Sequence, residues 1–148
     1  MYYLYVDGGR TFECGFFSYK LFDDDDSPIN EVQAKKFKLL NLGSRLPKSC
    51  PIIDENGNQT NNISEYCAVY FGLDHFIKKF GKSPVTIYHD SELVIRQIAG
   101  KIDLRGIPHY QCKSAHLLPW LAEIENLWYP SITYKWVSRK IIVKRLGH

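Results

Sequence analysis

The stretch Tyr2-Tyr3-Leu4-Tyr5-Val6-Asp7-Gly8-Gly9 opens the chain and decides how the rest of it is interpreted. Aromatic and β-branched side chains favour an extended strand over residues 2–7. The same layout recurs at Val85-Thr86-Ile87-Tyr88-His89-Asp90, where a second apolar run over 85–89 ends on an acid. Acids that end two strands can meet at one edge of a sheet. The sequence therefore predicts that Asp7 and Asp90 lie close together.

A third acid, Glu65, stands near the start of a long helix predicted for residues 62–80. Apolar side chains recur there at spacings of three and four residues, and Gly81 and Pro84 mark its end. Carboxylates gathered from such elements are the oxygen ligands that Mg²⁺ prefers. The alternative interpretation treats Asp7 and Asp90 as acids of ordinary turns and Glu65 as a first-turn residue suited to the helix dipole.

The remaining elements predict a mixed sheet with helices on its faces. Further strands are expected over 12–22, 32–40 and 129–137, and further helices over 91–99, where Gly100 is the stop signal, and 115–127. The four consecutive acids of 23–26 are predicted to form a solvated hairpin turn. Residues 43–58 are expected to form a loop. The order β-β-β-α-β-α-α-β predicts an α/β fold with a five-stranded sheet, in a single domain spanning residues 1–148.

Three short motifs, taken in this order, resemble the acidic signature of type 1 ribonuclease H. They are Asp-Gly-Gly after the first strand, Thr-x-Asn-x-x-Glu at the start of the long helix, and Asp-Ser after the later strand, and the likeness runs from Tyr2 to about Arg139. The resemblance implies a ribonuclease H-like fold. It also implies an endonuclease that hydrolyses the RNA strand of RNA–DNA hybrids with two Mg²⁺ ions, for which Mn²⁺ can substitute. By the same likeness Asp7 would bridge both ions, and Glu65 and Asp90 would help to bind one of them.

The likeness extends to contacts with the nucleic acid. Asn61 and Asn62 match a turn that meets the minor groove, although capping or solvation of the helix explains Asn61 and Glu92 as well. Glu92 stands where the family often has Gln. Basic side chains interleaved with aromatic ones suit a phosphate backbone and could hold the DNA strand. The expected substrate-binding residues are Gly8, Gly9, Asn61, Asn62, Ser91, Glu92, Lys101 and Arg105.

The C-terminus departs from the family, which usually reads Val-Pro-Arg-x-x-Asn-x-x-Ala-Asp there. The Asp that ends this motif is the family's fourth metal-binding acid. Here Trp136-Val137-Ser138-Arg139 is followed by residues that put Leu146 at its position. Either this ligand is lost or His148 supplies it as a catalytic residue; a frayed, exposed end is the alternative for His148. We expect no closing helix after the fifth strand. Two other functions stay open on this evidence, a catalytically impaired nucleic-acid-binding module and a DNA-cutting member of the superfamily.

Bulk composition is compatible with these predictions. The 148 residues suit one domain, and a formal charge of +3 permits a polyanionic partner. The N-terminus lacks a signal-peptide layout, and no apolar stretch approaches the roughly 20 residues of a membrane span. We therefore expect a cytoplasmic monomer without membrane contact. Cys14, Cys50, Cys67 and Cys112 show no metal-binding spacing and are predicted to be reduced, packed thiols.

Overall fold

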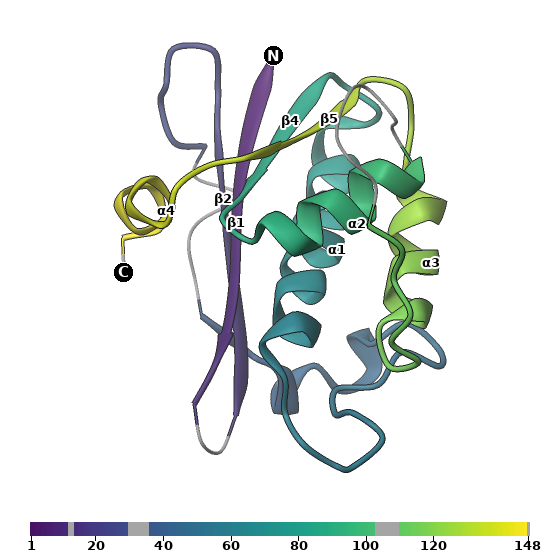
Figure 1. Ribbon diagram of the computed structural model, residues 1–148. Helices are drawn as coiled ribbons and strands as arrows, with labels where there is room; N and C mark the ends of the chain where they lie inside the picture. The colour runs from purple at the N-terminus through teal and green to yellow at the C-terminus, as the bar shows by residue number, and fades with distance from the viewer. Residues whose placement is uncertain (12–13, 30–35, 103–109, 148) are drawn as a thin grey trace.

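Five strands form one mixed sheet in the order β3-β2-β1-β4-β5, and helices cover both of its faces (Figure 1). The computed structural model describes residues 1–11, 14–29, 36–102 and 110–147. Strands β1, β2 and β3 are antiparallel, whereas β4 and β5 run parallel to β1. This confirms the predicted five-stranded α/β fold. The strands are β1 (Tyr2–Arg10), β2 (Gly15–Phe22), β3 (Phe37–Lys38), β4 (Val85–His89) and β5 (Ile132–Trp136).

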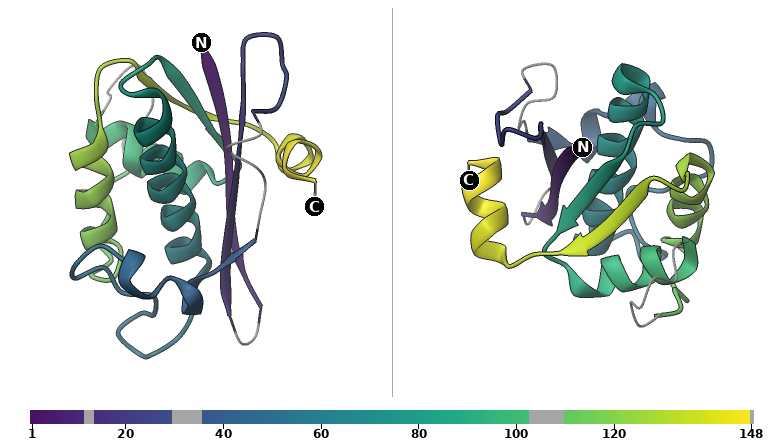
Figure 2. Two further views of the ribbon diagram at one scale, coloured as in Figure 1. Left: turned by 180° about the vertical axis from the view of Figure 1, so that it is seen from behind. Right: turned by 90° about the horizontal axis from the view of Figure 1, so that it is seen from above.

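Three helices lie on one face of the sheet and a fourth on the other, as the two further views also show (Figure 2). Helices α1 (Asn61–Phe80), α2 (Glu92–Ile102) and α3 (Leu118–Leu127) cover the main core. The fourth helix, α4 (Arg139–Leu146), packs against β1 and β2 on the opposite face. A smaller apolar cluster lies beneath it, made of Tyr5, Phe22, Ile142 and Leu146.

Strand register brings the two strand-end acids together. Tyr5 pairs with Tyr88 in the parallel β1–β4 ladder, so the same offset carried two residues further places Asp90 opposite Asp7. Side chains alternate along a strand. Because Leu4 and Val6 belong to the main core, Tyr5 and Asp7 face the side of the sheet that carries α4.

Helix α1 begins and ends on residues suited to those positions. The Thr60 hydroxyl accepts a hydrogen bond from the Ile63 amide at 3.1 Å and caps the first turn. Gly81, with φ of 66°, ends the helix as predicted. The start at Asn61 is one residue earlier than the sequence suggests.

The expectation that the chain has no closing helix is wrong. Ser138 precedes the eight residues of α4, and Gly147 ends it in the left-handed conformation with φ of 79°. Ile142 and Leu146 are four residues apart, so both lie on the helix side that faces the sheet, where they are buried. This burial stabilises a helix that would be too short to persist alone.

Other boundaries also differ from the predictions. Helix α2 continues through Gly100, and α3 starts at Leu118 rather than at 115. The third strand is described over Phe37–Lys38 and ends there because Leu39–Asn41 is a 3-10 turn; the predicted residues 32–35 lie outside the described part. The second strand begins at Gly15, and a turn joining Tyr129 to Ile132 delays β5 until Ile132.

Two smaller predictions are confirmed. The Asp23 carboxylate accepts hydrogen bonds from the amides of Asp25 and Ser27, so residues 23–27 form the expected turn. All four cysteines are free and buried. No described helix combines the length and the apolar character needed to cross a membrane.

Candidate functional site

Gly8 lets the start of α1 rest directly on β1. A Cβ atom at this position would lie 2.3 Å from the carbonyl carbon of Ser64 and 2.4 Å from the amide nitrogen of Glu65, so no larger residue fits. A Cβ atom at Gly9 would meet none of the described residues within 4 Å. Gly8 therefore serves the packing of α1, and the contact carries Glu65 to the strand that bears Asp7.

Asp7 and Asp90 share one cation, the guanidinium of Arg139. Its Nη1 atom donates hydrogen bonds to Asp7 Oδ2 at 2.7 Å and to Asp90 Oδ2 at 3.0 Å. The side chains of Asp7 and Asp90 are 6% and 10% exposed, whereas that of Arg139 is 60% exposed. The first residue of α4 thus covers two nearly buried carboxylates from the solvent side.

Glu65 completes a group of three carboxylates. Burial raises its pKa, and the nearby charges of Asp90 and Asp7 raise it further, against the lowering effects of His89 and a hydrogen bond with Ser91. Its Oε2 atom is buried and has no hydrogen-bond partner among the described residues. One oxygen of the group is therefore available to an added ligand.

The pKa of Asp90 is shifted in the opposite direction to that of Glu65. Burial acts to raise the pKa of Asp90, but hydrogen bonds from His89 and Arg139 outweigh it and lower the pKa. His89 Nδ1 lies 3.4 Å from Asp90 Oδ1, yet it also accepts the Ser91 amide at 3.0 Å. The shorter contact has ordinary hydrogen-bond length, so Nδ1 is better assigned as an acceptor. We therefore attribute the lowered pKa mainly to Arg139.

The end of β5 holds the Asp90 turn from the other side. The indole nitrogen of Trp136 donates to the Asp90 carbonyl at 3.0 Å, and the Val137 amide donates to the His89 carbonyl at 3.0 Å. The Trp136 ring remains half exposed beside the carboxylates. Backbone bonds of this kind fix where the Asp90 side chain begins.

The position of the family's fourth acid is apolar in structure as well as in sequence. Leu146 is 4% exposed and packs in the cluster with Tyr5 and Phe22. It supplies no oxygen to the site. His148, the other candidate, lies outside the described residues.

Asp7, Glu65 and Asp90 do not form a preformed metal site. Within the described ranges, no three His, Cys, Asp or Glu side chains are grouped closely enough to hold an ion. Asp7 and Asp90 instead close on the Arg139 guanidinium. The donor set still suits a hard cation, since it offers three carboxylates and the unpartnered Oε2 of Glu65.

A groove of about 230 Å³ leads away from Asp7 along β1 and β2. A second, open hollow of about 510 Å³ lies at the start of α1, where Arg10 donates to the Gln59 carbonyl at 3.3 Å. The groove is lined by Asp7, Gly8, Gly9, Arg10, Thr11, Phe16, Phe17, Ser18, Lys36 and Arg139. The hollow is lined by Arg10, Asp54, Asn58, Gln59, Thr60, Asn61 and Asn62.

The structure distributes the expected substrate contacts unevenly. Gly9 and the Asn61–Asn62 pair border these hollows beside the site. The Ser91 hydroxyl accepts the Val94 amide at 3.3 Å at the start of α2, and Glu92 pairs with Arg96 one turn along that helix. The side chain of Lys101 and the whole of Arg105 lie outside the described residues.

Sequence reasoning did not assign three groups at the site. Arg139, His89 and Lys36 carry no predicted role at the site. A signal for His89 exists, because a polar residue in a buried strand next to a candidate ligand needs a partner. Lys36 had none.

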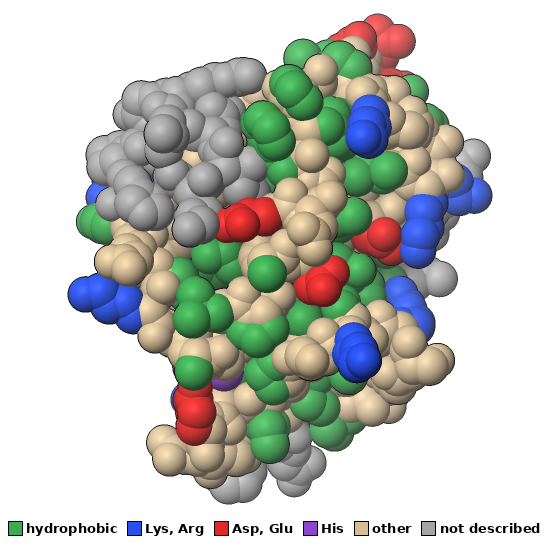
Figure 3. All heavy atoms as spheres, turned by 90° about the vertical axis from the view of Figure 1, so that its right-hand side faces the viewer, with side chains coloured by type: hydrophobic (Ala, Val, Ile, Leu, Met, Phe, Trp, Pro, Cys, Tyr) green, Lys and Arg blue, Asp and Glu red, His purple; other side chains and the backbone are tan. Residues whose placement is uncertain are grey.

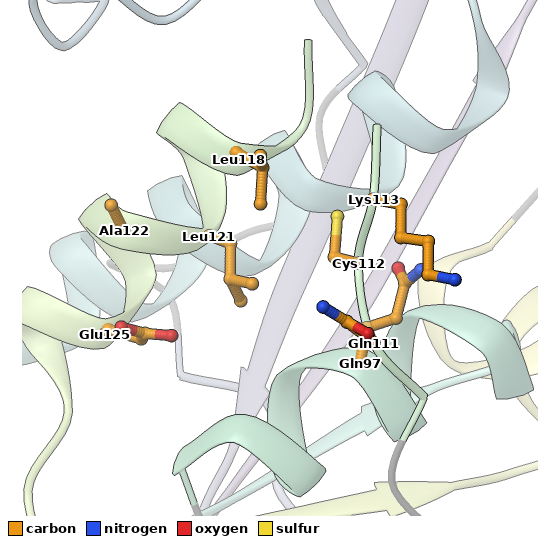
Figure 4. A pocket seen from close by; sticks show the side chains of 8 residues that line it. All are labelled: Gln97, Gln111, Cys112, Lys113, Leu118, Leu121, Ala122 and Glu125. Atoms are coloured by element: carbon orange, nitrogen blue, oxygen red, sulfur yellow. The ribbon is translucent and has the colours of Figure 1, made fainter. Parts of the chain in front are cut away.

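A larger cavity of about 640 Å³ lies elsewhere, between α2, α3 and residues 111–113 (Figure 4). Leu118 and Leu121 project into it from α3, opposite Cys112. None of Asp7, Glu65 and Asp90 lines it. The face formed by these helices mixes hydrophobic, acidic and basic side chains (Figure 3). The volume of a cavity therefore does not show where the candidate site lies in this protein.

Comparison with solved structures identifies the fold as that of ribonuclease H. The N-terminal RNase H domain of Rv2228c from Mycobacterium tuberculosis aligns with 97% of this chain and 86% of its own, with a TM-score of 0.71 and 22% identity. LC11-RNase H1 in complex with an RNA/DNA hybrid aligns with 98% of this chain and 91% of its own, with a TM-score of 0.71 and 18% identity. RNase H1 from the halophilic archaeon Halobacterium salinarum NRC-1 aligns with 97% of this chain and 89% of its own, with a TM-score of 0.68 and 18% identity.

Sequence comparison gives a shorter match. The bifunctional protein Rv2228c of M. tuberculosis is 31% identical over 85 residues, which is 56% of this chain and 21% of that protein. An uncharacterized protein of Mycobacterium bovis, Mb2253c, matches to the same extent. The aligned part thus spans about a fifth of the length of these curated relatives. No family model matches the sequence.

Proposed function

We propose that this protein is a metal-dependent nuclease of the ribonuclease H type that cleaves the RNA strand of RNA–DNA hybrids. One observation carries the proposal: Asp7 at the end of β1 and Asp90 after β4 meet at one guanidinium, and the close approach of α1 to Gly8 brings Glu65 to the same strand. Carboxylates brought together from three separate segments are the oxygen ligands that a divalent cation prefers. The ribonuclease H fold of the chain supports this proposal.

Asp7, Glu65 and Asp90 would hold Mg²⁺, or Mn²⁺ in its place. When bound, such ions lower the pKa of an attacking water and stabilise charge on the departing oxygen. The protein's own contribution is to hold the carboxylates in place. Gly8 fixes Glu65 against β1, and the hydrogen bond from Trp136 fixes the backbone at Asp90.

The substrate assignment draws on the surroundings of the carboxylates. The groove beside Asp7 carries Arg10, Lys36 and Arg139, cations suited to a phosphate backbone. Gly9 leaves one wall of it open. Among the solved structures with this fold, LC11-RNase H1 holds an RNA/DNA hybrid, which supports a hybrid as the ligand here.

A second candidate is a nucleic-acid-binding module with impaired catalysis. Arg139 between Asp7 and Asp90, together with Leu146 in the apolar cluster, favours it. Either function uses the same groove. They differ in whether the bound RNA strand is cut.

Labelled RNA–DNA hybrid, duplex DNA and duplex RNA, incubated with Mg²⁺ and then Mn²⁺, distinguish these functions. We expect cuts in the RNA strand of the hybrid, and none with Asp7→Asn folded to the same extent. Hybrid binding without cleavage by the parent would support the binding module, and cleavage of duplex DNA alone would reject hybrid specificity. In the same assay, His148→Ala should cleave like the parent, because Asp7, Glu65 and Asp90 would already supply the carboxylates that hold the ions.

A further inference from the structure

One nitrogen atom of Arg139 stands where two carboxylates meet. Nη1 contacts Oδ2 of Asp7 and Oδ2 of Asp90, one oxygen from each side chain. A cation that binds both residues through these two oxygens would compete with the guanidinium for them. It would also be repelled by a guanidinium at that distance, because like charges a few ångström apart interact strongly near a buried site.

The guanidinium is delivered by a helix that is anchored elsewhere. Ile142 and Leu146 bury themselves against Tyr5 and Phe22. Farther along α4, the Arg145 guanidinium lies over the ring of Phe22, 4.7 Å from its centroid, and pairs with Asp26 at 2.7 Å. The anchor is therefore independent of the carboxylates, yet it determines where Arg139 reaches them.

The neighbouring cation on the helix makes no such contact. Lys140 is exposed and forms no hydrogen bond or ion pair with the described residues. The two residues carry the same charge on adjacent positions of α4. Any effect specific to Arg139 is thus separable from the general positive field of the helix.

From these contacts we propose that Arg139 is a built-in counter-ion that competes with the divalent cation for Asp7 and Asp90, so that the docking of α4 sets the metal affinity of the site. The proposal rests on the proposed function for the identity of the competing ion. With no metal bound, the guanidinium neutralises the carboxylates. When a metal binds, the Arg139 side chain must leave at least one of them, which its exposed position allows.

Isothermal titration of the nucleic-acid-free protein with MgCl₂ and with MnCl₂ tests this without using activity. Arg139→Gln should bind the metal about tenfold more tightly than the parent, on the scale of one lost charge–charge contact near a protein surface. Lys140→Gln, the matched control, should change affinity less than about twofold. Arg139→Lys should fall between the parent and Arg139→Gln. Circular dichroism and thermal melting verify that each variant is folded.

A double-mutant cycle tests the role of the anchor. Leu146→Ala loosens α4 and should also tighten metal binding, but not in a protein that already carries Arg139→Gln. Weaker or unchanged metal binding by Arg139→Gln would overturn the proposal, as would failure of both proteins to bind metal.

The two proposals fail separately. A parent that cuts the hybrid while Arg139→Gln shows no gain in affinity leaves the nuclease standing and removes the counter-ion. Suppose instead that the parent binds metal but cuts nothing, and that Arg139→Gln binds the metal more tightly. The counter-ion proposal then stands and the nuclease proposal fails.

Discussion

Arg145 pairs with Asp26 at 2.7 Å, so the last turn of α4 is tied to the turn that follows β2. The same guanidinium lies over the rings of Tyr5 and Phe22, at 5.2 and 4.7 Å from their centroids. Asp26 has a left-handed backbone with φ of 59°, a conformation that Asp and Asn tolerate well. One arginine thus joins a helix, two strands and a turn.

Replacing Arg145 should weaken the attachment of α4. Arg145→Ala removes both the ion pair and the ring contacts, and we expect a loss of about 1 kcal/mol in the free energy of unfolding. Asp26→Asn removes only the ion pair and keeps the left-handed backbone, so it should cost less. Urea denaturation measures both. Equal losses for the two variants would mean that the ring contacts contribute nothing.

Gly8→Ala should separate β1 from α1. The added methyl would overlap the backbone of Ser64 and Glu65, and we expect a loss of roughly 1–3 kcal/mol in stability, as for other overpacked positions. Gly9→Ala is the control, because its methyl would enter open space. Thermal or urea denaturation compares them. A fully stable Gly8→Ala protein would contradict the close approach.

The pH dependence of stability should depend on Glu65. Its pKa is raised by burial, so folding favours the protonated form; that stabilisation is full below the usual pKa of 4.5 and is lost as the pH rises through the folded pKa. In metal-free buffer, Glu65→Gln should therefore gain stability over the parent as the pH rises from 4 to 7.

Asp90→Asn should show the opposite trend. The pKa of Asp90 is lowered, so its charged form stabilises the fold above the usual value of 3.8, and this contribution is lost as the pH falls. The variant should thus be less stable than the parent at pH 7 and approach it in acid. Urea titrations at several pH values measure both variants. Parallel pH profiles for the parent and Glu65→Gln would refute the role of Glu65.

Restoring the family's acid at position 146 should not repair the site. Leu146→Asp places a carboxylate in the cluster of Tyr5, Phe22 and Ile142, and we expect a loss of about 2–5 kcal/mol or more. Leu146→Asn, of similar size but neutral, separates the cost of the charge from that of the lost packing. Denaturation and metal titration report the result. A stable Leu146→Asp protein that binds metal more tightly than Leu146→Asn would show that α4 can rotate to deliver the acid.

The periodic spacing of apolar residues predicted the helices and strands that depend on local sequence. The β4 strand over Val85–His89 and the helix up to Phe80 follow from apolar spacing and stop signals. The closing helix was missed because the departure from the family motif outweighed the i, i+4 spacing of Ile142 and Leu146. That spacing was present in the sequence and indicated a buried helical face.

The cation at the candidate site could not be predicted in the same way. Asp7, Glu65 and Asp90 were identified from motifs, since each follows a recognisable strand or opens a helix. The contact of Arg139 with Asp7 joins residues 132 positions apart and exists only because α4 docks on β1 and β2. No local pattern encodes such a long-range geometry.

The approach of Gly8 to Ser64 divides the site into a rigid half and an adjustable half. A Cβ atom at position 8 would overlap the backbone of α1, so the two backbones lie close together and no side chain at position 8 can change the spacing between them. Asp90 lies beyond the last paired residues of β1 and β4, Tyr5 and Tyr88, and Arg139 reaches it only through a flexible side chain. Ions of different radius would therefore be accommodated by side-chain movement of Asp90 and Arg139, while the backbones that carry Asp7 and Glu65 keep their separation.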